Sequence, residues 1–535
     1  MSTEKTNRRE FLQLTAASAA GVLLHEKTMN AQNRFDSGFE LNEATIADLQ
    51  NRMARGQMSA KEIAEEYIER IRRVDKNGAQ VNSVIETNID AIRIAEEMDR
   101  ERKAGRVRSA LHGVPILLKD NIDTADRMRT TAGSLALIDA ATPQRDAFLV
   151  QQLRNAGAVI LGKTNLSEWA NFRSSNSSSG WSGRGGQTRN PYVLDRNPCG
   201  SSSGSGAAVA ANLAAAAIGT ETDGSIICPA SNCGIVGIKP TLGLVSRSGV
   251  IPIAHSQDTA GPMARTVTDA AILLGALTGV DSRDSVTRGQ KAQKDYTQFL
   301  QPNGLRGARI GVMRQYFGKN GKVDAVLETA LDVMKRAGAT LVDVKFPTFD
   351  KFGDDEFQVL LYEFKAGLNQ YLAGRNSRYK TLADLIRFNE ENKDREMPFF
   401  GQDIFISAQK KGDLNSREYR LALQKSKTMT QAQGIDQIMT QNKLDAIFAP
   451  SNAPTWTTDL VNGDCGSGYI GSSSWAAVSG YPSITVPAGF VQGLPVGVSF
   501  FGRAWAENIL LKLAYSFEQA TRARRAPQFL PTASY

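Results

Sequence analysis

Apolar side chains recur at helical spacing soon after the first fifty residues of the chain. Ile63, Tyr67, Ile68 and Ile71 follow one another at intervals that place them on one face of a helix. The order Ser-Ala-Lys-Glu, which begins at Ser59, is typical of a capping box. In such a box the Ser and Glu side chains bind N–H groups that the first helical turn leaves free. The pattern therefore predicts a helix that begins after Ser59.

The same reasoning predicts further helices and strands. The helices are expected at residues 90–103, 147–155, 209–218, 325–337, 414–441 and 506–522. Short apolar runs predict strands at 114–118, 158–161, 310–313, 340–344, 446–449 and 483–487. Strands that alternate with helices indicate the α/β class. Because the chain after residue 31 has no fixed-period repeat and no Pro-rich or charged linker, we expect one large domain.

The composition favours a globular protein without a nucleic-acid partner. Hydrophobic residues make up 41% of the 535 residues and charged residues 22%, so the chain can bury a large core. The formal net charge is +8, but the basic residues are spread along the chain apart from a short run at Arg522, Arg524 and Arg525. Nucleic-acid binding is favoured by basic residues that cluster on one face, so we expect no nucleic-acid partner.

The first 31 residues differ from the rest of the chain. Arg8 and Arg9 precede an apolar, Ala-rich run over residues 14–24, an order that resembles a twin-arginine export signal. A chance Arg-Arg pair before a helix is the alternative. The resemblance predicts that residues 1–31 are cleaved, that residues 32–535 form the folded domain, and that the protein is periplasmic or secreted. The run is too short to span a bilayer and no other long apolar run occurs, so the mature form is expected to have no membrane partner.

The four cysteines do not have the spacing of a metal site. Cys228 and Cys233 are five residues apart and no histidine lies near them, whereas zinc sites combine closely spaced Cys or His ligands. We therefore expect no metal and no other cofactor. Cys199, Cys228 and Cys233 flank a Gly- and Ser-rich segment and are expected to pack as small buried residues. An exported protein permits a disulfide, but no pairing follows from the sequence.

One stretch matches the phosphate-binding loop pattern letter for letter. Residues 157–164 read GAVILGKT. In a true phosphate loop the residues between the glycines form a loop whose N–H groups surround the phosphate. Here those residues are Ala-Val-Ile-Leu, which predict a buried strand. We therefore expect no nucleotide binding.

The residues with the strongest chemical indication lie in segment 198–230, where two Gly/Ser-rich turns flank an Ala-rich run. Such turns can present a serine nucleophile beside N–H groups that bind an oxyanion. The chain has only three histidines, His25, His112 and His255, so a serine-histidine pair has few candidates. Lys119, which follows the apolar run 114–118, is an alternative base if burial keeps it neutral. A buried ion pair between Lys119 and the neighbouring Asp120 is the other interpretation.

Several motifs together resemble the amidase signature family. The longest are GVPILLKD at 113–120, GSSSGS at 200–205 and GTETDGSI at 219–226, with shorter matches at 162–165, 237–241 and 258–262. The resemblance extends from about residue 49 to about residue 520. It implies the amidase signature fold, a single large domain in which helices surround a central mixed β-sheet.

The resemblance also implies a set of catalytic residues. Ser225 is the implied nucleophile, Ser201 the bridging serine after a cis Gly200–Ser201 bond, and Lys119 the base. The implied oxyanion donors are the backbone N–H groups of Thr222, Asp223, Gly224 and Ser225. An acyl group formed on Ser225 would then be released by water.

Three positions depart from the usual family pattern. Asp223 replaces a glycine before the nucleophile, Ile227 replaces an arginine after it, and Cys199 replaces a glycine before the bridging serine. The combination resembles the peptide amidase branch, whose members release ammonia from C-terminal peptide amides. A general acylamide amidase, a protein similar to the A subunit of the tRNA-dependent amidotransferase and a catalytically silent scaffold are the alternatives. The expected partner is a small-molecule or peptide amide, and the expected state is a monomer.

Two loops are candidates for reading the substrate. Residues 171–186 and 451–474 are rich in Ser and Gly, and Trp181, Trp456 and Trp475 lie in or beside them. This content fits a roomy and partly aromatic groove. It fits ordinary surface loops equally well.

Overall fold

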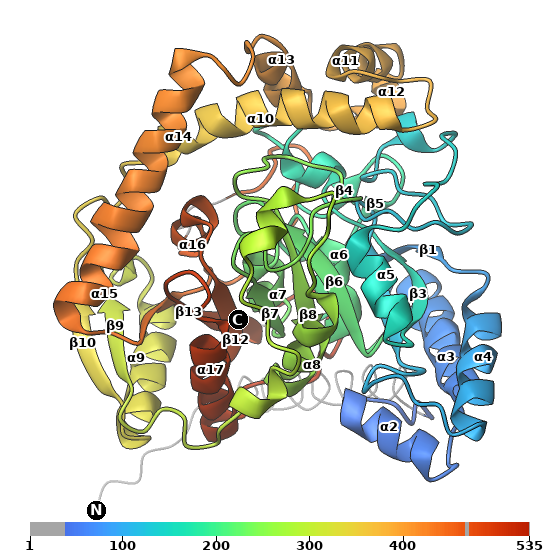
Figure 1. Cartoon of the computed structure of the whole chain (residues 1–535), viewed down its shortest axis with the longest axis horizontal. Helices are drawn as coiled ribbons and strands as arrows, with labels where there is room; N and C mark the ends of the chain where they lie inside the picture. The colour runs from blue at the N-terminus through green and yellow to red at the C-terminus, as the bar shows by residue number, and fades with distance from the viewer. Residues whose placement is uncertain (1–37, 466–469, 534–535) are drawn as a thin grey trace, which may run out of the picture.

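A single eleven-stranded sheet crosses the centre of the protein. The computed structural model describes residues 38–465 and 470–533, and Figure 1 shows the helices arranged around the sheet. The strand order is β1-β3-β2-β6-β8-β7-β12-β13-β11-β9-β10. The strands are β1 (Val84–Thr87), β2 (Pro115–Lys119), β3 (Val159–Thr164), β6 (Ala216–Glu221), β7 (Val236–Lys239), β8 (Thr259–Ala264), β9 (Arg309–Met313), β10 (Thr340–Val344), β11 (Ala446–Pro450), β12 (Ser483–Val491) and β13 (Leu494–Phe501).

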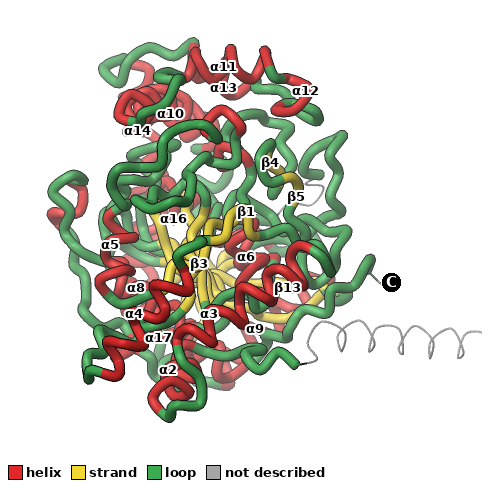
Figure 2. Tube along the Cα trace, turned by 90° about the vertical axis from the view of Figure 1, so that its right-hand side faces the viewer, coloured by secondary structure: helices red, strands yellow, loops and turns green. Residues whose placement is uncertain are grey.

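The sheet is mixed, and its central strands are buried. Strand β2 pairs in parallel with both β3 and β6, whereas β6 pairs antiparallel with β8. Every residue of β2, β3 and β6 is buried, as expected where helices cover both faces of a sheet. Figure 2 shows the strands as a central layer with helices around it. The predicted single α/β domain with a central mixed sheet is therefore confirmed.

Sixteen α-helices occur in the described residues. They are α2 (Ile46–Ala54), α3 (Ala60–Arg70), α4 (Ala91–Lys103), α5 (Phe148–Asn155), α6 (Ser203–Ala210), α7 (Ile227–Asn232), α8 (Val267–Leu277), α9 (Gly321–Arg336), α10 (Gly353–Gly374), α11 (Leu382–Glu391), α12 (Lys393–Glu396), α13 (Asp403–Gln409), α14 (Arg417–Thr430), α15 (Asp436–Asn442), α16 (Ser473–Ser479) and α17 (Glu507–Thr521). None of them has the length and apolar character needed to cross a bilayer. A short hairpin of β4 (Trp181–Ser182) and β5 (Gly186–Gln187) lies outside the main sheet.

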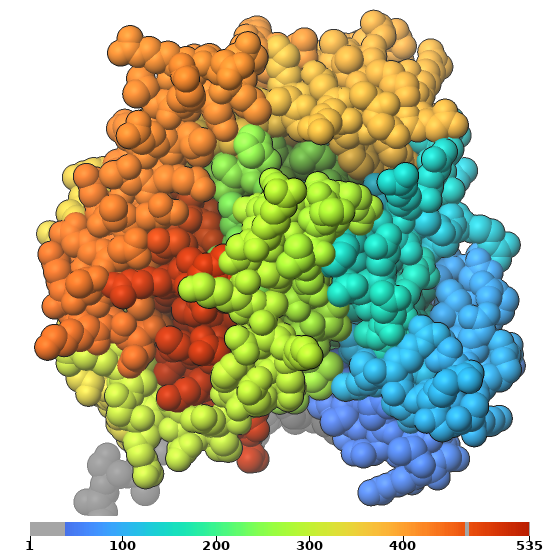
Figure 3. Space-filling view, viewed as in Figure 1, coloured from blue at the N-terminus to red at the C-terminus, as the bar shows by residue number. Residues whose placement is uncertain are grey.

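Helices α10 to α14 form a layer over one edge of the sheet, at the top of Figures 1 and 3. A second apolar cluster joins this layer to the body of the protein. Leu360 and Phe364 of α10 and Phe405 of α13 pack there with Trp169 and Phe172. The layer therefore lies beside the loop that contains Phe172 and covers that part of the molecule.

Most of the predicted elements are confirmed, but the predicted helix at 209–218 is wrong. Helix α6 ends at Ala210, and the next regular element is strand β6. Alanine has no strong strand preference, so the local sequence favours a helix. Pairing of β6 with β2 and β8 in the buried centre of the sheet overrides that preference. The predicted capping box before α3 is confirmed, since Ser59 and Glu62 bind each other's backbone N–H groups.

The predicted export signal at residues 1–31, which includes His25, lies outside the described residues. In the part of the chain that the structure describes, no group of three His, Cys, Asp or Glu side chains is placed to hold a metal ion.

Candidate active site

The three predicted catalytic side chains come from segments that meet at one edge of the sheet. Lys119 is the last residue of β2, Ser201 lies in the turn before α6, and Ser225 lies in the turn between β6 and α7. Because β2 and β6 are parallel, their carboxyl ends lie at the same edge. The turn that follows β6 is therefore brought next to Lys119.

Lys119 is fully buried and points at Ser201. Its Nζ atom lies 2.8 Å from Oγ of Ser201 and 2.9 Å from Oγ1 of Thr220. Burial lowers the pKa of Lys119 to about 7, while the negative charges of Glu221 and Asp258 act in the opposite direction. A large fraction of this lysine is therefore neutral at neutral pH, as a base must be.

Asp120 does not pair with Lys119. Successive side chains on a strand point to opposite faces, and Asp120 instead pairs with Arg184 at 3.3 Å and accepts a hydrogen bond from Thr131. The ion-pair interpretation of Lys119 and Asp120 is therefore wrong.

Ser201, the predicted bridging serine, is held in a buried turn. Ser201 is fully buried, and the peptide bond between Gly200 and Ser201 is cis, as the family resemblance implies. A Cβ atom on Gly200 would lie 2.2 Å from Oγ of Ser167, so no larger residue fits there without rearrangement. The N–H group of the next residue, Ser202, donates to the carbonyl oxygen of Ser225 at 3.1 Å. This bond joins the two serine-bearing turns directly.

The turn that holds Ser225 has unused backbone donors. The carboxylate of Glu221 accepts from the N–H groups of Ile226 at 2.7 Å and Ile227 at 2.9 Å, which fixes the far side of the turn. Among the described residues, no acceptor is hydrogen-bonded to the N–H groups of Asp223, Gly224 and Ser225. Gly224 has a φ of 75°, which favours glycine at this position. The turn can therefore offer successive N–H groups to an anion.

Ser225 lies where two cavities meet. A small inner pocket of about 20 Å³ is lined by Ser201, Thr220 and Ser225, among others. A larger open cavity of about 340 Å³ is lined by Ser225 together with Asp223 and Gly224. A substrate in the larger cavity can thus contact Ser225 while Lys119 stays buried.

The two predicted substrate loops contribute to the larger cavity. Asn171, Phe172 and Ser179 line it from the first loop, and Trp456 and Asp464 from the second. The other two tryptophans predicted in or beside these loops do not line this cavity. Trp181 contacts Phe399 and Phe400, and Trp475 contacts Phe346 and Phe352.

Neither described histidine lines these cavities. His112 is buried, and its Nε2 atom lies 2.9 Å from the carbonyl oxygen of Met98. His255 is exposed, and its Nδ1 atom lies 3.3 Å from a carboxylate oxygen of Glu363. Of these three side chains, only Lys119 contacts Ser201.

The phosphate-loop match has a structural explanation. Residues 159–161, between its glycines, belong to β3, and Lys163 is buried with Nζ 2.6 Å from the carbonyl oxygen of Ile122. A Cβ atom on Gly162 would lie 2.4 Å from the carbonyl oxygen of Glu86 on the neighbouring strand. Close strand packing thus accounts for this glycine.

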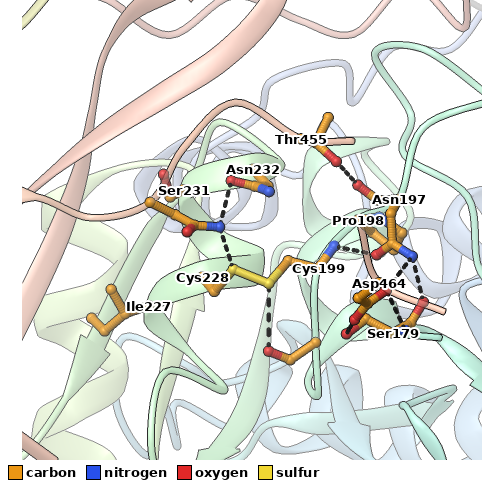
Figure 4. The surroundings of a disulfide bond; sticks show 12 residues. Ser179, Asn197, Pro198, Cys199, Ile227, Cys228, Ser231, Asn232, Thr455 and Asp464 are labelled. Atoms are coloured by element: carbon orange, nitrogen blue, oxygen red, sulfur yellow. Dashed lines mark hydrogen bonds between the residues drawn. A yellow bond between two sulfur atoms is a disulfide. The ribbon is translucent and has the colours of Figure 1, made fainter. Parts of the chain in front are cut away.

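A disulfide that the sequence did not predict lies in the wall of the larger cavity. Cys199 and Cys228 are bonded, with their Cα atoms 5.9 Å apart (Figure 4). All three cysteines of this segment are buried, as expected; Cys199 and Cys228 form the disulfide that the sequence left open, and Cys233 is free. The disulfide joins the turn of Ser201 to α7, the helix that follows Ser225. The two cysteines are 29 residues apart in the sequence, and this spacing alone does not indicate that they pair.

Removal of the disulfide is expected to destabilise the fold. Replacing Cys199 and Cys228 together by serine should lower the free energy of unfolding by about 2–4 kcal/mol, because the unfolded chain regains the freedom that the cross-link removes. Chemical denaturation with and without a reductant measures this effect. Reductant should destabilise the parent protein and leave the double variant unchanged. Equal denaturation midpoints for the oxidised parent and the double variant would contradict the expectation.

Some groups at the site were not predicted as site residues from the sequence. Thr220 binds Lys119, and Asp258 accepts a hydrogen bond from Thr222 at 2.6 Å. Both residues lie in the motifs named above, so the motifs could have indicated that they belong to the site. Glu356 contacts Asp223 from α10, and no motif includes it.

Comparisons with known proteins agree with this geometry. A sequence model of the family described as Amidase matches residues 62–511. The chain belongs to the amidase family. It is therefore a hydrolase that acts on C–N bonds of amides, and the resemblance drawn from the motifs is confirmed.

Individual relatives are similar over nearly their full length. The structure of native peptide amidase from Stenotrophomonas maltophilia is 49% identical, with a TM-score of 0.87 over 92% of this chain and 99% of the other. A probable amidase of Arabidopsis thaliana is 42% identical over 94% of each chain. The A subunit of a glutamyl-tRNA(Gln) amidotransferase from Acinetobacter baumannii is 35% identical over 90% of this chain and 97% of its own. The predicted likeness to the peptide amidase branch is thus confirmed.

Proposed function

We propose that this amidase hydrolyses C-terminal amides of peptides through an acyl-enzyme on Ser225. The observation that carries the proposal is the 2.8 Å contact between Nζ of Lys119 and Oγ of Ser201. Ser201 in turn lines a small pocket together with Ser225. A lysine in this place is useful as a base only when neutral, and its burial favours that state.

The chemistry follows from the contacts. Neutral Lys119 takes the proton of Ser201, which takes that of Ser225, and Oγ of Ser225 attacks the amide carbon. The N–H groups of Asp223, Gly224 and Ser225 stabilise the negative oxygen that develops, together with that of Thr222. The proton returns through Ser201 to the leaving nitrogen, so that ammonia departs and an ester remains on Ser225. Water, activated by the same base, then releases the carboxylic acid.

The larger cavity supports a peptidic acyl group. Its volume of about 340 Å³ and its open form leave room for several residues of a chain. Phe172, Ile253, Leu360 and Trp456 supply apolar surface in its wall. The similar solved structures also include a peptide amidase in complex with the competitive inhibitor chymostatin, 49% identical to this chain. This likeness favours peptide amides over simple acyl amides.

A substrate panel tests the proposal. An N-protected dipeptide amide, a simple acyl amide and a peptide with only internal peptide bonds are compared by ammonia release and by product analysis. The proposal expects ammonia from the dipeptide amide with the highest kcat/KM and no cleavage of internal bonds. Equal or faster turnover of the simple amide would instead indicate a general acylamide amidase. Activity only with charged tRNA and further protein components would indicate an amidotransferase.

The rate is expected to rise with pH around neutrality. Lys119 must lose a proton to act, and its pKa is about 7, so kcat/KM should increase as the pH rises through 7. A pH profile of dipeptide amide hydrolysis in a constant-ionic-strength buffer series measures this limb. A rate that peaks in acid and falls through pH 7 would contradict a neutral lysine base.

We also propose that the protein is exported with loss of residues 1–31 and acts as a monomer in the periplasm or outside the cell. The Arg8–Arg9 pair before an apolar run supports export. N-terminal sequencing of the protein from cell fractions, with and without Arg8→Lys and Arg9→Lys, tests the signal. Size-exclusion chromatography tests the oligomeric state. Retention of residues 1–31 in the cytoplasmic fraction would overturn export.

A further inference from the structure

The side chain of Asp223 is anchored on both oxygen atoms. Oγ of Ser473 donates to Oδ1 at 2.6 Å and Oγ of Ser474 donates to Oδ2 at 2.5 Å. Both serines begin α16, which reaches the site from the C-terminal part of the chain. Asp223 also lines the larger cavity, and its backbone belongs to the proposed oxyanion turn.

A second carboxyl group contacts Asp223 from the helical layer. Glu356 lies in the first turn of α10, is buried, and is hydrogen-bonded to the side chain of Asp223. Two carboxylates cannot form such a bond, because one of them must supply a proton. Nε2 of Gln257 donates to Oε1 of Glu356 at 2.9 Å and lies 3.2 Å from the carbonyl oxygen of Thr222. Glu356 and Gln257 therefore bind adjacent residues of the same turn.

We infer that Glu356 is a positioning residue, a carboxylic acid that holds the oxyanion turn in place by sharing its proton with Asp223. The inference rests on the proposed role of this turn in binding the oxyanion. A shift of the turn would move the N–H groups of Asp223 and Gly224 away from the reacting oxygen. Such groups stabilise the transition state more than the bound substrate, so Glu356 should affect kcat more than KM.

The surroundings favour retention of the shared proton. Burial raises the pKa of Glu356 well above its usual range, and the charge of Asp223 raises it further. Burial also raises the pKa of Asp223, against the hydrogen bonds from Ser473 and Ser474. Both shifts favour a proton retained between the two groups. Loss of that proton at alkaline pH would leave two carboxylates in contact, which repel each other.

Charged groups on several elements surround Glu356 and Asp223. Lys239 on β7 attracts Asp223, while Glu221 at the end of β6 repels it. On α10, Asp355 is paired with Lys425 at 2.6 Å.

Three other charged side chains near Glu356 and Asp223 have polar partners of their own. Glu363, further along α10, accepts a hydrogen bond from Tyr419 at 2.7 Å. Asp258 is occupied by Thr222 and by two backbone N–H groups. Lys427 on α14 lies 3.5 Å from the carbonyl oxygen of Ser256.

The alkaline limb of the pH profile tests this inference. The parent enzyme should lose kcat reversibly at alkaline pH. Glu356→Gln keeps a hydrogen-bond donor that cannot ionise, so it should retain most of the activity at neutral pH and lose the alkaline decline. Glu356→Leu, which removes the donor, should lower kcat roughly tenfold or more at every pH while KM changes little.

Thermal unfolding gives a second readout that does not depend on the substrate. A carboxyl group with a raised folded-state pKa stabilises the fold fully below its unfolded-state pKa and loses that contribution as the pH rises through the folded-state pKa. The unfolding temperature of the parent should therefore fall more steeply than that of Glu356→Gln as the pH rises from the ordinary carboxyl range through the raised pKa of Glu356. The inference is overturned if Glu356→Gln keeps both the alkaline decline in kcat and the steep fall in unfolding temperature. The parent could fail to hydrolyse peptide amides and still show a steeper fall in unfolding temperature than Glu356→Gln. In that case the proposed function is wrong, but the proton shared by Glu356 and Asp223 is supported.

Discussion

Ser225→Ala is expected to reduce peptide amide hydrolysis by roughly six orders of magnitude. Loss of the nucleophile in serine hydrolases that act through an acyl-enzyme has an effect of about this size. The variant keeps the oxyanion donors and the cavity, so it should still bind substrate with little change in affinity. Ammonia release from an N-protected dipeptide amide, at enzyme concentrations high enough to detect a residual rate, measures the loss.

Ser231→Ala is the matched control for Ser225→Ala. Ser231 is buried in α7, only six residues further on, and its Oγ accepts a hydrogen bond from the N–H group of Gly497 at 3.0 Å. It lines neither cavity at Ser225, so its removal should change activity by no more than a few-fold. Activity of Ser225→Ala within tenfold of the parent would exclude Ser225 as the nucleophile.

Substitution of Lys119 is expected to have the second largest effect. Lys119→Met keeps much of the volume and apolar stem but removes the base, and general bases contribute about 10²–10⁴-fold to rates. The variant should lose at least that factor in kcat. It should also lose the rise in rate through pH 7, because the group that titrates there is gone.

Lys119→Arg separates a base from a positive charge. Arginine keeps a cation near Ser201 but does not give up its proton at accessible pH. If Lys119 acts as the base, Lys119→Arg should be as inactive as Lys119→Met. If a positive charge beside Ser201 is what matters, Lys119→Arg should retain a substantial share of the parent activity. Circular dichroism and thermal unfolding of both variants show whether the buried change is tolerated.

The residues at the site could be predicted because they lie in short local motifs. The apolar run of β2 indicated that Lys119 would be carried into the interior, and the two Gly/Ser turns marked Ser201 and Ser225. The structure brings all three to one edge of the sheet. The family resemblance supplied the roles, which composition and spacing alone did not.

Contacts between distant segments could not be predicted. The Ala-rich run that continues into β6 has no periodicity that separates helix from strand, and only the pairing of β6 with β2 and β8 determines the form of its last residues. Glu356 lies more than a hundred residues from Asp223, in a helix without a recognised motif, so nothing local indicated their contact. The pairing of Cys199 with Cys228 likewise depends on how the two turns meet.

Covalent labelling of Ser225 tests the central claim most directly. The parent protein is treated with a serine-reactive fluorophosphonate, the fraction of lost activity is recorded, and the modified residue is located by mass spectrometry after proteolysis. The account predicts one adduct per chain, on Ser225, in proportion to the lost activity, and slower labelling in Lys119→Met. Inactivation that tracks an adduct on any other residue, or full activity after complete labelling of Ser225, would contradict it.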